Sequence, residues 1–486
     1  MTDTLAELAP RELWRHFSRL SEIPRPSGAE QAALDYVKAV AEERGAGWRQ
    51  DDAGNVVVFV DGEPGPTVAV QAHLDMVCEK DLGVEHDFTK DPIKVMRDGN
   101  RVYAQGTTLG ADNGIGAAAA LALLTSDGVR HGPLELVFTV REETGLHGAM
   151  EFNGSLLQSK MLINLDSEDP DELTIGCAGG ATVEVRPPLK WTSTPEGWQA
   201  RELVVTGLTG GHSGVDIDKP RANALKVALS VLSGLRTASE VRLAGISGGT
   251  GHNVIPREAA VQIVVSPDSA ERLGQAVHGL AQALMSEWAG KEPNLQVGLN
   301  EIPAPPKVLE ARSEDGLLAL LADIPHGPQD WSETFPGKVE TSVNLAQVRV
   351  SPDEAVIVAS ARSLSAHKLF RMRTAISTAG LKIGAKAEVT GSYPGWDPEP
   401  DAPLLKTAAR LYEEVNGKPA SIEVIHAGLE CGVLVSKKQD MQAISFGPRI
   451  TGPHSPQETV DVDTVDATWR LLVAILNAVL EEQPPA

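Results

Sequence analysis

The chain of 486 residues has few cysteines, a deficit of basic residues and no long apolar run. Its three cysteines are scattered and form no Cys-x-x-Cys pair, which disfavours a disulfide framework and favours a reducing compartment. Lysine and arginine together number 43 against 66 acidic residues, which argues against a nucleic-acid or anionic-membrane partner. No segment is apolar over the width of a bilayer, and the first residues do not form a signal peptide. We therefore expect a cytoplasmic protein with no membrane or nucleic-acid partner.

A chain of this length usually contains more than one hydrophobic core, so we expect two domains. Near-continuous apolar segments such as "NVVVFV" (55–60) and "LELVFTV" (134–140) are typical of strands covered on both faces, and helical patterns separate them. This order predicts an α/β fold with a layered, mostly parallel sheet. The pattern of apolar strand and helix segments changes after "GCAGG" (176–180). The first pattern resumes beyond the Pro/Gly-rich "GSYPGWDPEPDAP" (391–403). The predicted parts are a domain formed by residues 1–180 and 394–486, and an inserted α+β domain at residues 181–393.

One apolar strand pattern, "VAVQAH" (68–73), ends with His73 and is followed two residues later by Asp75. Side chains two apart on a strand point to the same face, so an imidazole is expected beside a carboxylate. Taken alone, this pair fits two structures. It is either a polar strand end facing solvent or a metal-ligating histidine whose second nitrogen is oriented by the aspartate.

Five further acidic or histidine side chains occur where predicted strands or helices begin or end. Each alone has a simpler explanation, such as a helix N-cap for Asp112 or solvated carboxylates after a strand. Together they fall where the carboxyl edge of one α/β sheet would bind a ligand. Two histidines and three carboxylates suit two zinc ions with one bridging carboxylate, and a further acid remains to take a proton from water. The five further residues are Asp112, Glu142, Glu143, Asp166 and His454, and His73 is the second histidine.

Six segments resemble, in order along nearly the whole chain, the signatures of the dinuclear-zinc metallopeptidase family that includes carboxypeptidase G, aminoacylase and the cytosolic dipeptidases. Within that family, "HAGLECG" (426–432) and the large insertion are most similar to the bacterial Xaa-His, or aminoacyl-histidine, dipeptidases. The resemblance implies a zinc-peptidase catalytic domain interrupted by an α+β lid domain. The six segments are "AHLDMV", "GTTLGADNG", "REETGLHGA", "NLDSED", "GGHSG" and "GPHSPQE".

The resemblance also implies the roles of individual residues. Asp112 corresponds to the carboxylate that bridges the metals, and its peptide bond to Asn113 is typically cis in the family. Glu142 corresponds to the general base, and Asp75 corresponds to the residue that orients His73. The implied metal ligands are His73, Asp112, Glu143, Asp166 and His454. They would hold two Zn²⁺ ions, or other divalent ions such as Co²⁺ or Mn²⁺.

The inserted domain is expected to contribute to the site as well. By resemblance, His212 in "TGGHSG" stabilises the oxyanion, and the alternative is an ordinary surface turn, since glycines surround it. Asn253 and Arg362 match lid positions that contact the carboxylate end of the substrate, and a guanidinium suits a carboxylate. His426 and Glu430 in "HAGLECG" belong either to the wall of the site or to the supporting structure.

The implied activity is hydrolysis of dipeptides, Xaa-His dipeptides such as β-alanyl-histidine (carnosine) included, by a water activated between two zinc ions and a glutamate. In this family Asp166 goes with dipeptidases and aminopeptidases, whereas a glutamate there goes with carboxypeptidases and aminoacylases. The alternative is an N-acyl amino acid amidohydrolase with the same site. A silent scaffold would have lost a ligand or the base, and a serine or cysteine hydrolase would need a nucleophile motif that the chain lacks. The expected partner is a small dipeptide and the expected state a monomer or homodimer, with other histidines such as His16 at surface or capping positions.

Overall fold

The computed structural model describes residues 5–438 and 440–481, which fall into two compact units. Unit 1 consists of Met1–Cys177, Trp396–Val424 and Leu429–Ala486, and unit 2 consists of Ala178–Gly395 and Ile425–Gly428. The sequence pattern predicts an insertion at residues 181–393 and assigns residues 425–428 to the other domain. These four residues instead pack with the insertion, because Ile425 accepts a backbone hydrogen bond from Ala178 and the His426 carbonyl lies against Gly214.

Unit 1 is built on an eight-stranded mixed sheet. Its central strands β6, β3, β7 and β23 run parallel, whereas β1 and β2 at one side are antiparallel. Strands β3 and β6 are buried at every position, as expected for strands covered on both faces. The predicted layered, mostly parallel sheet is therefore confirmed. In spatial order the strands are β1 (Gly47–Gln50), β2 (Val56–Val60), β6 (Leu134–Thr139), β3 (Val68–His73), β7 (Met161–Asn164), β23 (Gln442–Ser445), β8 (Glu172–Cys177) and β22 (Ser421–Ile425).

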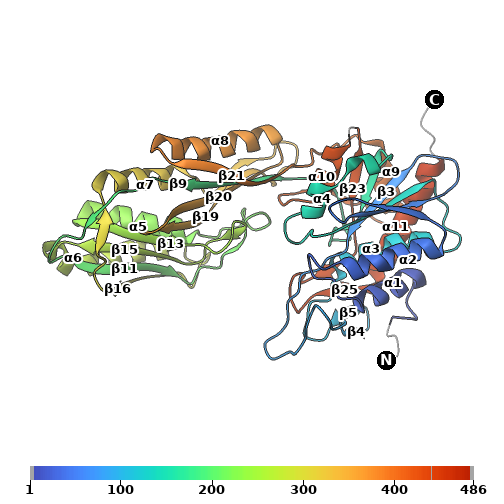
Figure 1. Cartoon of the computed structure of the whole chain (residues 1–486), viewed down its shortest axis with the longest axis horizontal. Helices are drawn as coiled ribbons and strands as arrows, with labels where there is room; N and C mark the ends of the chain where they lie inside the picture. Colours follow the sequence, from blue (N-terminus) through green and yellow to red (C-terminus); the bar gives the residue numbers. More distant parts are fainter. Residues whose placement is uncertain (1–4, 439, 482–486) are drawn as a thin grey trace. The chain divides into compact units, whose positions relative to one another are not determined.

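The helices of unit 1 pack on this sheet in two groups. The N-terminal helices form one group, in which α3 packs on β3 and α1 packs on α3, and α9 and α11 form the other (Figure 1). His16 of α1 is buried rather than at the surface or a cap, because its ring bonds to Tyr36 and Thr125. The helices are α1 (Arg11–Ser21), α2 (Gln31–Glu43), α3 (Ala111–Thr125), α4 (His147–Glu151), η1 (Gly154–Leu156), α9 (Pro403–Asn416), α10 (Glu430–Lys437) and α11 (Val462–Glu481). A small sheet adds β24 (Ile450–Thr451), β25 (Thr459–Asp461), β5 (Arg101–Ala104) and β4 (Val95–Asp98).

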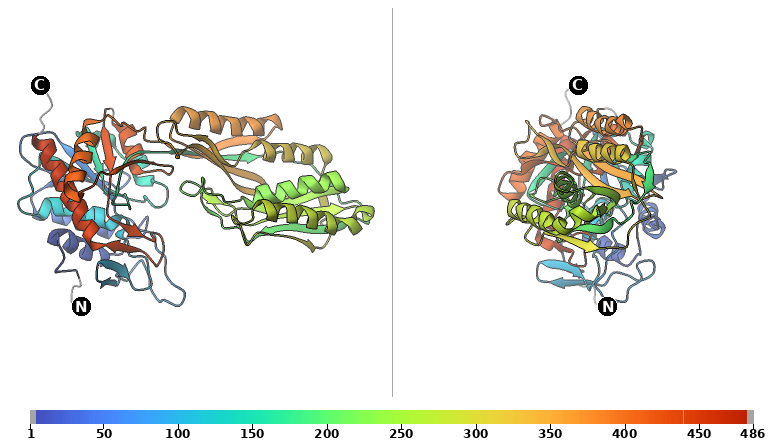
Figure 2. Two further views of the ribbon diagram at one scale, coloured as in Figure 1. Left: turned by 180° about the vertical axis from the view of Figure 1, so that it is seen from behind. Right: turned by 90° about the vertical axis from the view of Figure 1, so that its left-hand side faces the viewer.

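Unit 2 is an antiparallel sheet with helices running along it, as Figure 2 shows. Alternate strand residues and the apolar faces of the helices form one core, which is the α+β arrangement predicted for the insertion. The strands in order are β16 (Gln296–Glu301), β11 (Gln199–Thr206), β15 (Ala259–Val265), β13 (Val241–Gly248), β19 (Val339–Val350), β20 (Ala355–Ser363), β9 (Gly179–Arg186) and β21 (Lys386–Tyr393), with β18 (Gly327–Trp331) beside β19. Two short pairs are β10 (Trp191–Ser193) with β17 (Lys307–Leu309), and β12 (Gly211–His212) with β14 (Val254–Ile255). The helices are α5 (Ala224–Ala238), α6 (Pro267–Glu287), α7 (Ala311–Asp323) and α8 (Ala366–Lys382).

Candidate metal centre

Three neighbouring strands of unit 1 bring candidate ligands to one edge of the sheet. Strand β3 ends at His73, and β6 and β7 run parallel to it on either side. The chain leaves β6 towards Glu142 and Glu143 and leaves β7 towards Asp166. Parallel strands have their carboxyl ends at the same edge of a sheet, so these side chains gather there.

Asp112, in the first turn of α3, lies between two histidines. Its Oδ1 atom is 3.0 Å from Nε2 of His73, and its Oδ2 atom is 3.2 Å from Nε2 of His454. The peptide bond between Asp112 and Asn113 is cis, as the family resemblance predicts. A carboxylate that turns one oxygen towards each of two imidazoles has the arrangement of a ligand shared by two metal ions.

Each of these histidines has a second carboxylate beside it. Nε2 of His73 is 3.4 Å from Oδ1 of Asp166, and Nε2 of His454 is 3.0 Å from Oε2 of Glu143. The other oxygen of Glu143, Oε1, is buried and has no hydrogen-bond partner in the described part of the chain. Ligand atoms of His73, Asp112 and Glu143 all lie within 4.8 Å of one another. Nitrogen and carboxylate oxygen donors at such spacing suit zinc.

Asp75 supports the centre in two ways. Nδ1 of His73 is 3.0 Å from the backbone carbonyl of Asp75 and 3.5 Å from its Oδ1. The carboxylate also accepts the backbone N–H groups of Glu142 (3.0 Å) and Glu143 (3.1 Å) and the hydroxyl of Ser27 (2.7 Å). Burial would raise the pKa of Asp75, but the imidazole of His73 and these donors lower it to about 2. Asp75 therefore fixes both the ring of His73 and the start of the loop that carries the two glutamates.

Glu142 has the environment of a proton acceptor. Burial raises the pKa of its carboxyl well above the usual range, His73 opposes this shift, and the carboxylates of Asp166 and Glu143 add to it. A partly buried carboxyl beside candidate ligands, with its pKa displaced by named neighbours, is typical of a catalytic acid or base.

The carboxylates outnumber the histidines, and this excess of negative charge affects both rings. Hydrogen bonds to Asp112 and Glu143 raise the pKa of His454 to about 11. Burial lowers the pKa of His73, but Asp166 and Asp112 outweigh it and raise the pKa well above the usual value. Divalent cations would satisfy the same carboxylates and would bind to neutral imidazoles.

In unit 2, the histidine assigned to the oxyanion lies in a tightly hydrogen-bonded turn. Nδ1 of His212 accepts the backbone N–H groups of Gly214 (3.2 Å) and Val215 (3.3 Å). Since Nδ1 is an acceptor, the neutral ring carries its proton on Nε2. The backbone carbonyl of Asn253 accepts the N–H of Ser213 at 2.8 Å, which ties the Asn253 loop to this turn.

The two remaining candidate residues of unit 2 are linked by a serine. Arg362 of β20 is in register with Ser342 of β19, and the hydroxyl of Ser342 forms a 2.8 Å hydrogen bond with Nε2 of His426. Burial and the neighbouring Arg362 lower the pKa of His426 to about 3. Arg362 is only 8% exposed and donates to the hydroxyl of Tyr393, and its Nε has no partner among the described residues. Because the His426 carbonyl lies against Gly214, the four candidates of unit 2 form one connected group.

Comparison with known proteins places this chain in a family. Residues 69–478 match the model of peptidase family M20/M25/M40. The chain belongs to this peptidase family. It is 39% identical over 479 residues to the cytosol non-specific dipeptidase of Escherichia coli (strain K12), covering 98% of this chain and 99% of that protein.

Solved structures agree with this membership of family M20/M25/M40. The crystal structure of aminoacylhistidine dipeptidase from Vibrio alginolyticus matches with a TM-score of 0.87 and 36% identity over 98% of each chain. Human carnosine dipeptidase 1 matches with a TM-score of 0.52 and 12% identity over 97% of this chain and 96% of that one, which shows a shared fold alone. The predicted family and the predicted metallopeptidase class are confirmed.

Two further residues of this M20/M25/M40 chain bind the backbone beside the candidate ligands and were not identified from sequence. The buried carboxylate of Glu458 accepts four consecutive backbone N–H groups at the start of α3, at 2.7–3.2 Å. The buried guanidinium of Arg25 donates to the carbonyls of Leu74, Asp75 and Gly110. Glu458 lies within the quoted segment "GPHSPQE", which was the available signal, whereas no local pattern distinguishes Arg25.

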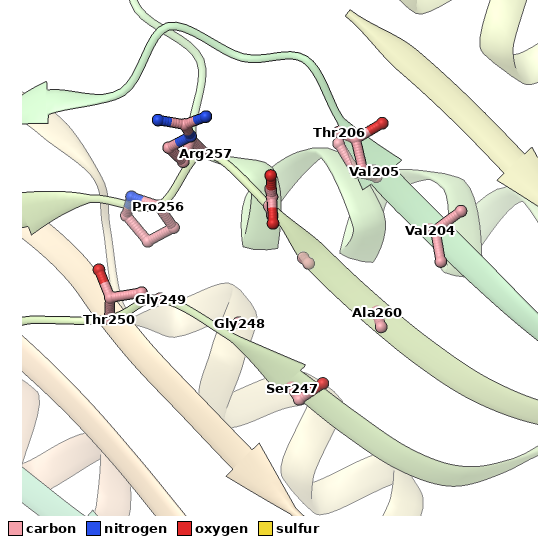
Figure 3. Close-up of a pocket in the computed structure, with 12 residues that line it drawn as sticks. Val204, Val205, Thr206, Ser247, Gly248, Gly249, Thr250, Pro256, Arg257 and Ala260 are labelled. Carbon is pink, nitrogen blue, oxygen red and sulfur yellow. The ribbon is translucent and has the colours of Figure 1, made fainter. Parts of the chain in front are cut away.

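A separate cavity of about 620 Å³ lies in unit 2, on strands β11, β13 and β15 (Figure 3). Its lining includes the small side chains of Ser247 and Ala260, together with Thr206 and Arg257. None of its lining residues is a histidine or one of the candidate site residues. The cavity is therefore distinct from the groups that the family resemblance assigns to catalysis.

Proposed function

We propose that this member of family M20/M25/M40 is a dipeptidase that hydrolyses Xaa-His dipeptides, carnosine included, at a centre of two zinc ions. The observation that carries the proposal is Asp112, which turns one oxygen towards His73 and the other towards His454. The names of two relatives that span nearly the whole chain support the substrate class, because both are dipeptidases and one is named for aminoacyl-histidine.

In this proposal, His73 and Asp166 would hold one ion, Glu143 and His454 would hold the other, and Asp112 would be shared. Buried carboxylate oxygens normally have a hydrogen-bond or ionic partner. The buried Oε1 of Glu143 has no hydrogen-bond partner among the described residues, which supports a cation as its partner. Zinc, when bound, would lower the pKa of the attacking water and polarise the scissile carbonyl. Co²⁺ and Mn²⁺ fit the same donors.

The chain's own residues supply the proton transfers and the positioning. We propose that Glu142 accepts a proton from the attacking water and delivers it to the leaving amine as the C–N bond breaks. Asp75 keeps the ring of His73 and the Glu142 loop in place, as its hydrogen bonds to both support. The Nε2–H of His212 donates to the oxyanion of the tetrahedral intermediate.

The substrate's carboxylate is assigned to the connected group of unit 2. The unpartnered Nε of the buried Arg362 supports this assignment, because a guanidinium can bind a carboxylate through two parallel hydrogen bonds. Asn253 and His426 are proposed to complete this contact. Asp166, by family resemblance, favours a substrate with a free amine.

The proposed localisation is the cytoplasm. The low number of cysteines and the name of the Escherichia coli relative support this localisation. The proposed binding partner is a small dipeptide, and the proposed oligomeric state is a monomer or a homodimer. Among the described helices, none combines the length and apolarity needed to cross a membrane.

A substrate panel on metal-defined protein tests the proposal. Protein stripped of metal and reconstituted with Zn²⁺ should bind two ions per chain and hydrolyse carnosine and other Xaa-His dipeptides, and a chelator should abolish turnover. Asp112→Ala should remove both ions, whereas His454→Ala should mainly weaken one. Fewer than two bound ions would contradict the dinuclear centre, and faster turnover of N-acetyl amino acids would show the amidohydrolase alternative to be right.

A further inference from the structure

A line of buried polar side chains crosses the sheet of unit 1 next to the candidate ligands. We call it the polar row. It takes one side chain from each of strands β6, β3, β7 and β23 and one from the start of α10, and all five side chains have an exposed fraction of 0%. Its members are Thr139, Gln71, Asn164, Ser445 and Glu430.

Along the polar row, each of the other side chains donates a hydrogen bond towards Glu430. The hydroxyl of Ser445 donates to Oδ1 of Asn164 (2.5 Å), and Nδ2 of Asn164 donates to Oε1 of Gln71 (2.6 Å). Nε2 of Gln71 then donates to Oε2 of Glu430 (2.5 Å), and the hydroxyl of Thr139 donates to the same oxygen (2.6 Å). Glu430 is therefore the final acceptor, and its oxygen sets the orientation of both amides.

The polar row is attached to the strands that carry the ligands. Gln71 is two residues before His73, so both side chains are on the same face of β3. Thr139 is directly in register with His73 on the neighbouring strand. Asn164 accepts the backbone N–H of Asp166 at 3.3 Å, which fixes the chain where it leaves β7.

We infer that Glu430 is a positioning residue of the metal centre, an inference that rests on the proposed function. Through Gln71 and Thr139, its acceptor oxygen fixes the strand ends that present the proposed ligands His73 and Asp166. Hydrogen-bonding partners one step behind the ligands commonly control ligand orientation in metal sites.

The acceptor oxygen, rather than a negative charge, is what Glu430 supplies. The other oxygen, Oε1, is buried without a hydrogen-bond partner in the described part of the chain, which disfavours a charge on this carboxyl. Burial raises the pKa of Glu430 to about 8, with His73 and Thr139 opposing the shift, which agrees with a neutral carboxyl at neutral pH. Glutamine should therefore replace Glu430 well, and an apolar side chain of similar size should not.

Three variants test this inference. Glu430→Met removes the acceptor shared by the Gln71 amide and the Thr139 hydroxyl, whereas Glu430→Gln keeps an acceptor oxygen. Glu135→Met is the matched control, because Glu135 is a buried glutamate (2% exposed) at the other end of β6, where it accepts the backbone N–H groups of Gln158 and Ser159. Zn²⁺ affinity is measured by competition with a chromophoric chelator, and thermal unfolding of the metal-free proteins reports on folding.

We expect Glu430→Met to bind Zn²⁺ about 10–100-fold more weakly than wild type, and Glu430→Gln to remain within a few-fold of it. Glu135→Met should lower the unfolding temperature and leave Zn²⁺ affinity unchanged. Wild-type affinity in Glu430→Met, equal losses in the two Glu430 variants, or an equal loss in Glu135→Met would each overturn the inference. These results differ from failure of the proposed function, in which wild-type protein itself binds no metal or cleaves no dipeptide.

Discussion

At the scale of single residues, two adjacent glutamates occupy different environments. Glu143 lies 3.0 Å from Nε2 of His454. Burial raises the pKa of Glu142 well above the usual range, the carboxylates of Asp166 and Glu143 add to this shift, and His73 opposes it. Both glutamates are placed by one carboxylate, since each donates its backbone N–H to Asp75. The two side chains thus suit different tasks, ligation for Glu143 and proton transfer for Glu142.

Exchanging each glutamate for glutamine separates these tasks. Glu142→Gln should bind Zn²⁺ like wild type and lose about two to four orders of magnitude in kcat, because an amide cannot accept the proton. Glu143→Gln is the matched control, and its main defect should be weaker binding of Zn²⁺. Metal content and kcat are measured on the same reconstituted samples. Near wild-type turnover by metal-loaded Glu142→Gln would show that Glu142 is not the base.

The residues proposed for the centre could be named at this scale, because they occur in short motifs at strand ends, and their roles stay predictions. Asp112 and His454 are far apart in sequence, yet the structure places them 3.2 Å apart, as two ligands of one centre require. The backbone contacts could not be predicted. Glu458 binds four N–H groups at the start of α3, and Arg25 binds three carbonyls, and such partners follow from the folded loops rather than from local sequence.

At the scale of elements, one buried histidine joins three helices. His16 of α1 forms hydrogen bonds with the hydroxyl of Tyr36 on α2 (2.6 Å) and that of Thr125 at the end of α3 (2.9 Å). The Thr125 hydroxyl donates to the carbonyl of Leu121, so the ring donates to Thr125 through Nε2 and accepts from Tyr36 at Nδ1. A neutral ring fits this pattern, because burial, with Arg15 adding to it, lowers the pKa of His16 to about 4.

This helix junction should make folding sensitive to mild acid. The unfolded chain takes up a proton at His16 near its ordinary pKa of about 6.5, whereas the folded protein does so only near 4. The contribution of His16 is therefore complete above pH 6.5 and is lost as the pH falls towards 4, with a slope of up to about 1.4 kcal/mol per pH unit.

The variant His16→Phe cannot titrate, so its free energy of unfolding should approach that of wild type as the pH falls. We expect the difference between the two to shrink by about 1–2 kcal/mol from pH 7 to pH 5. Urea unfolding of metal-free protein measures it, with the exposed His278 exchanged for glutamine as the control. A difference that stays constant over this range would show that His16 is not held neutral in the folded protein.

Long apolar elements were predictable, whereas short ones were not. Strands β3 and β6 lie where the patterns predict them, because their burial produces continuous apolar runs. The strands of the small sheet, such as β5 with four residues, are too short to produce a periodic signal. His16 shows the same limit, since a polar residue buried between helices has no pattern of its own.

At the scale of the whole molecule, the chain forms unit 1 from both ends and unit 2 from the middle. A change in the pattern of apolar segments and a Pro/Gly-rich segment were enough to predict that an insertion divides the first domain. Residues 425–428 were not predictable, because they join unit 2 through backbone contacts to Ala178 and Gly214 rather than through an apolar pattern. This segment lies between β22 and α10. The short motif "HAGLECG" therefore supplies His426 to unit 2 and Glu430 to unit 1.

The proposed roles of His212 and Glu142 belong to different units, and this allows a test of whether one chain supplies a complete active site. The predicted insertion spans 393 − 181 + 1 = 213 residues, which we expect to be large enough to supply His212 within one chain. His212→Ala should lower kcat by about 10²–10³ while changing KM less, because an oxyanion donor acts mainly in the transition state.

His212→Ala and Glu142→Gln chains carrying different tags are then co-expressed, and activity is measured on material that retains both tags and on the whole mixture. If His212 acts within its own chain, the mixture has no more activity than the two variants measured separately. If His212 acts across a homodimer, mixed pairs hold one intact site, and about a quarter of wild-type activity returns because half of the random pairings are mixed. Recovered activity of that size would contradict the single-chain prediction and make the homodimer the active form.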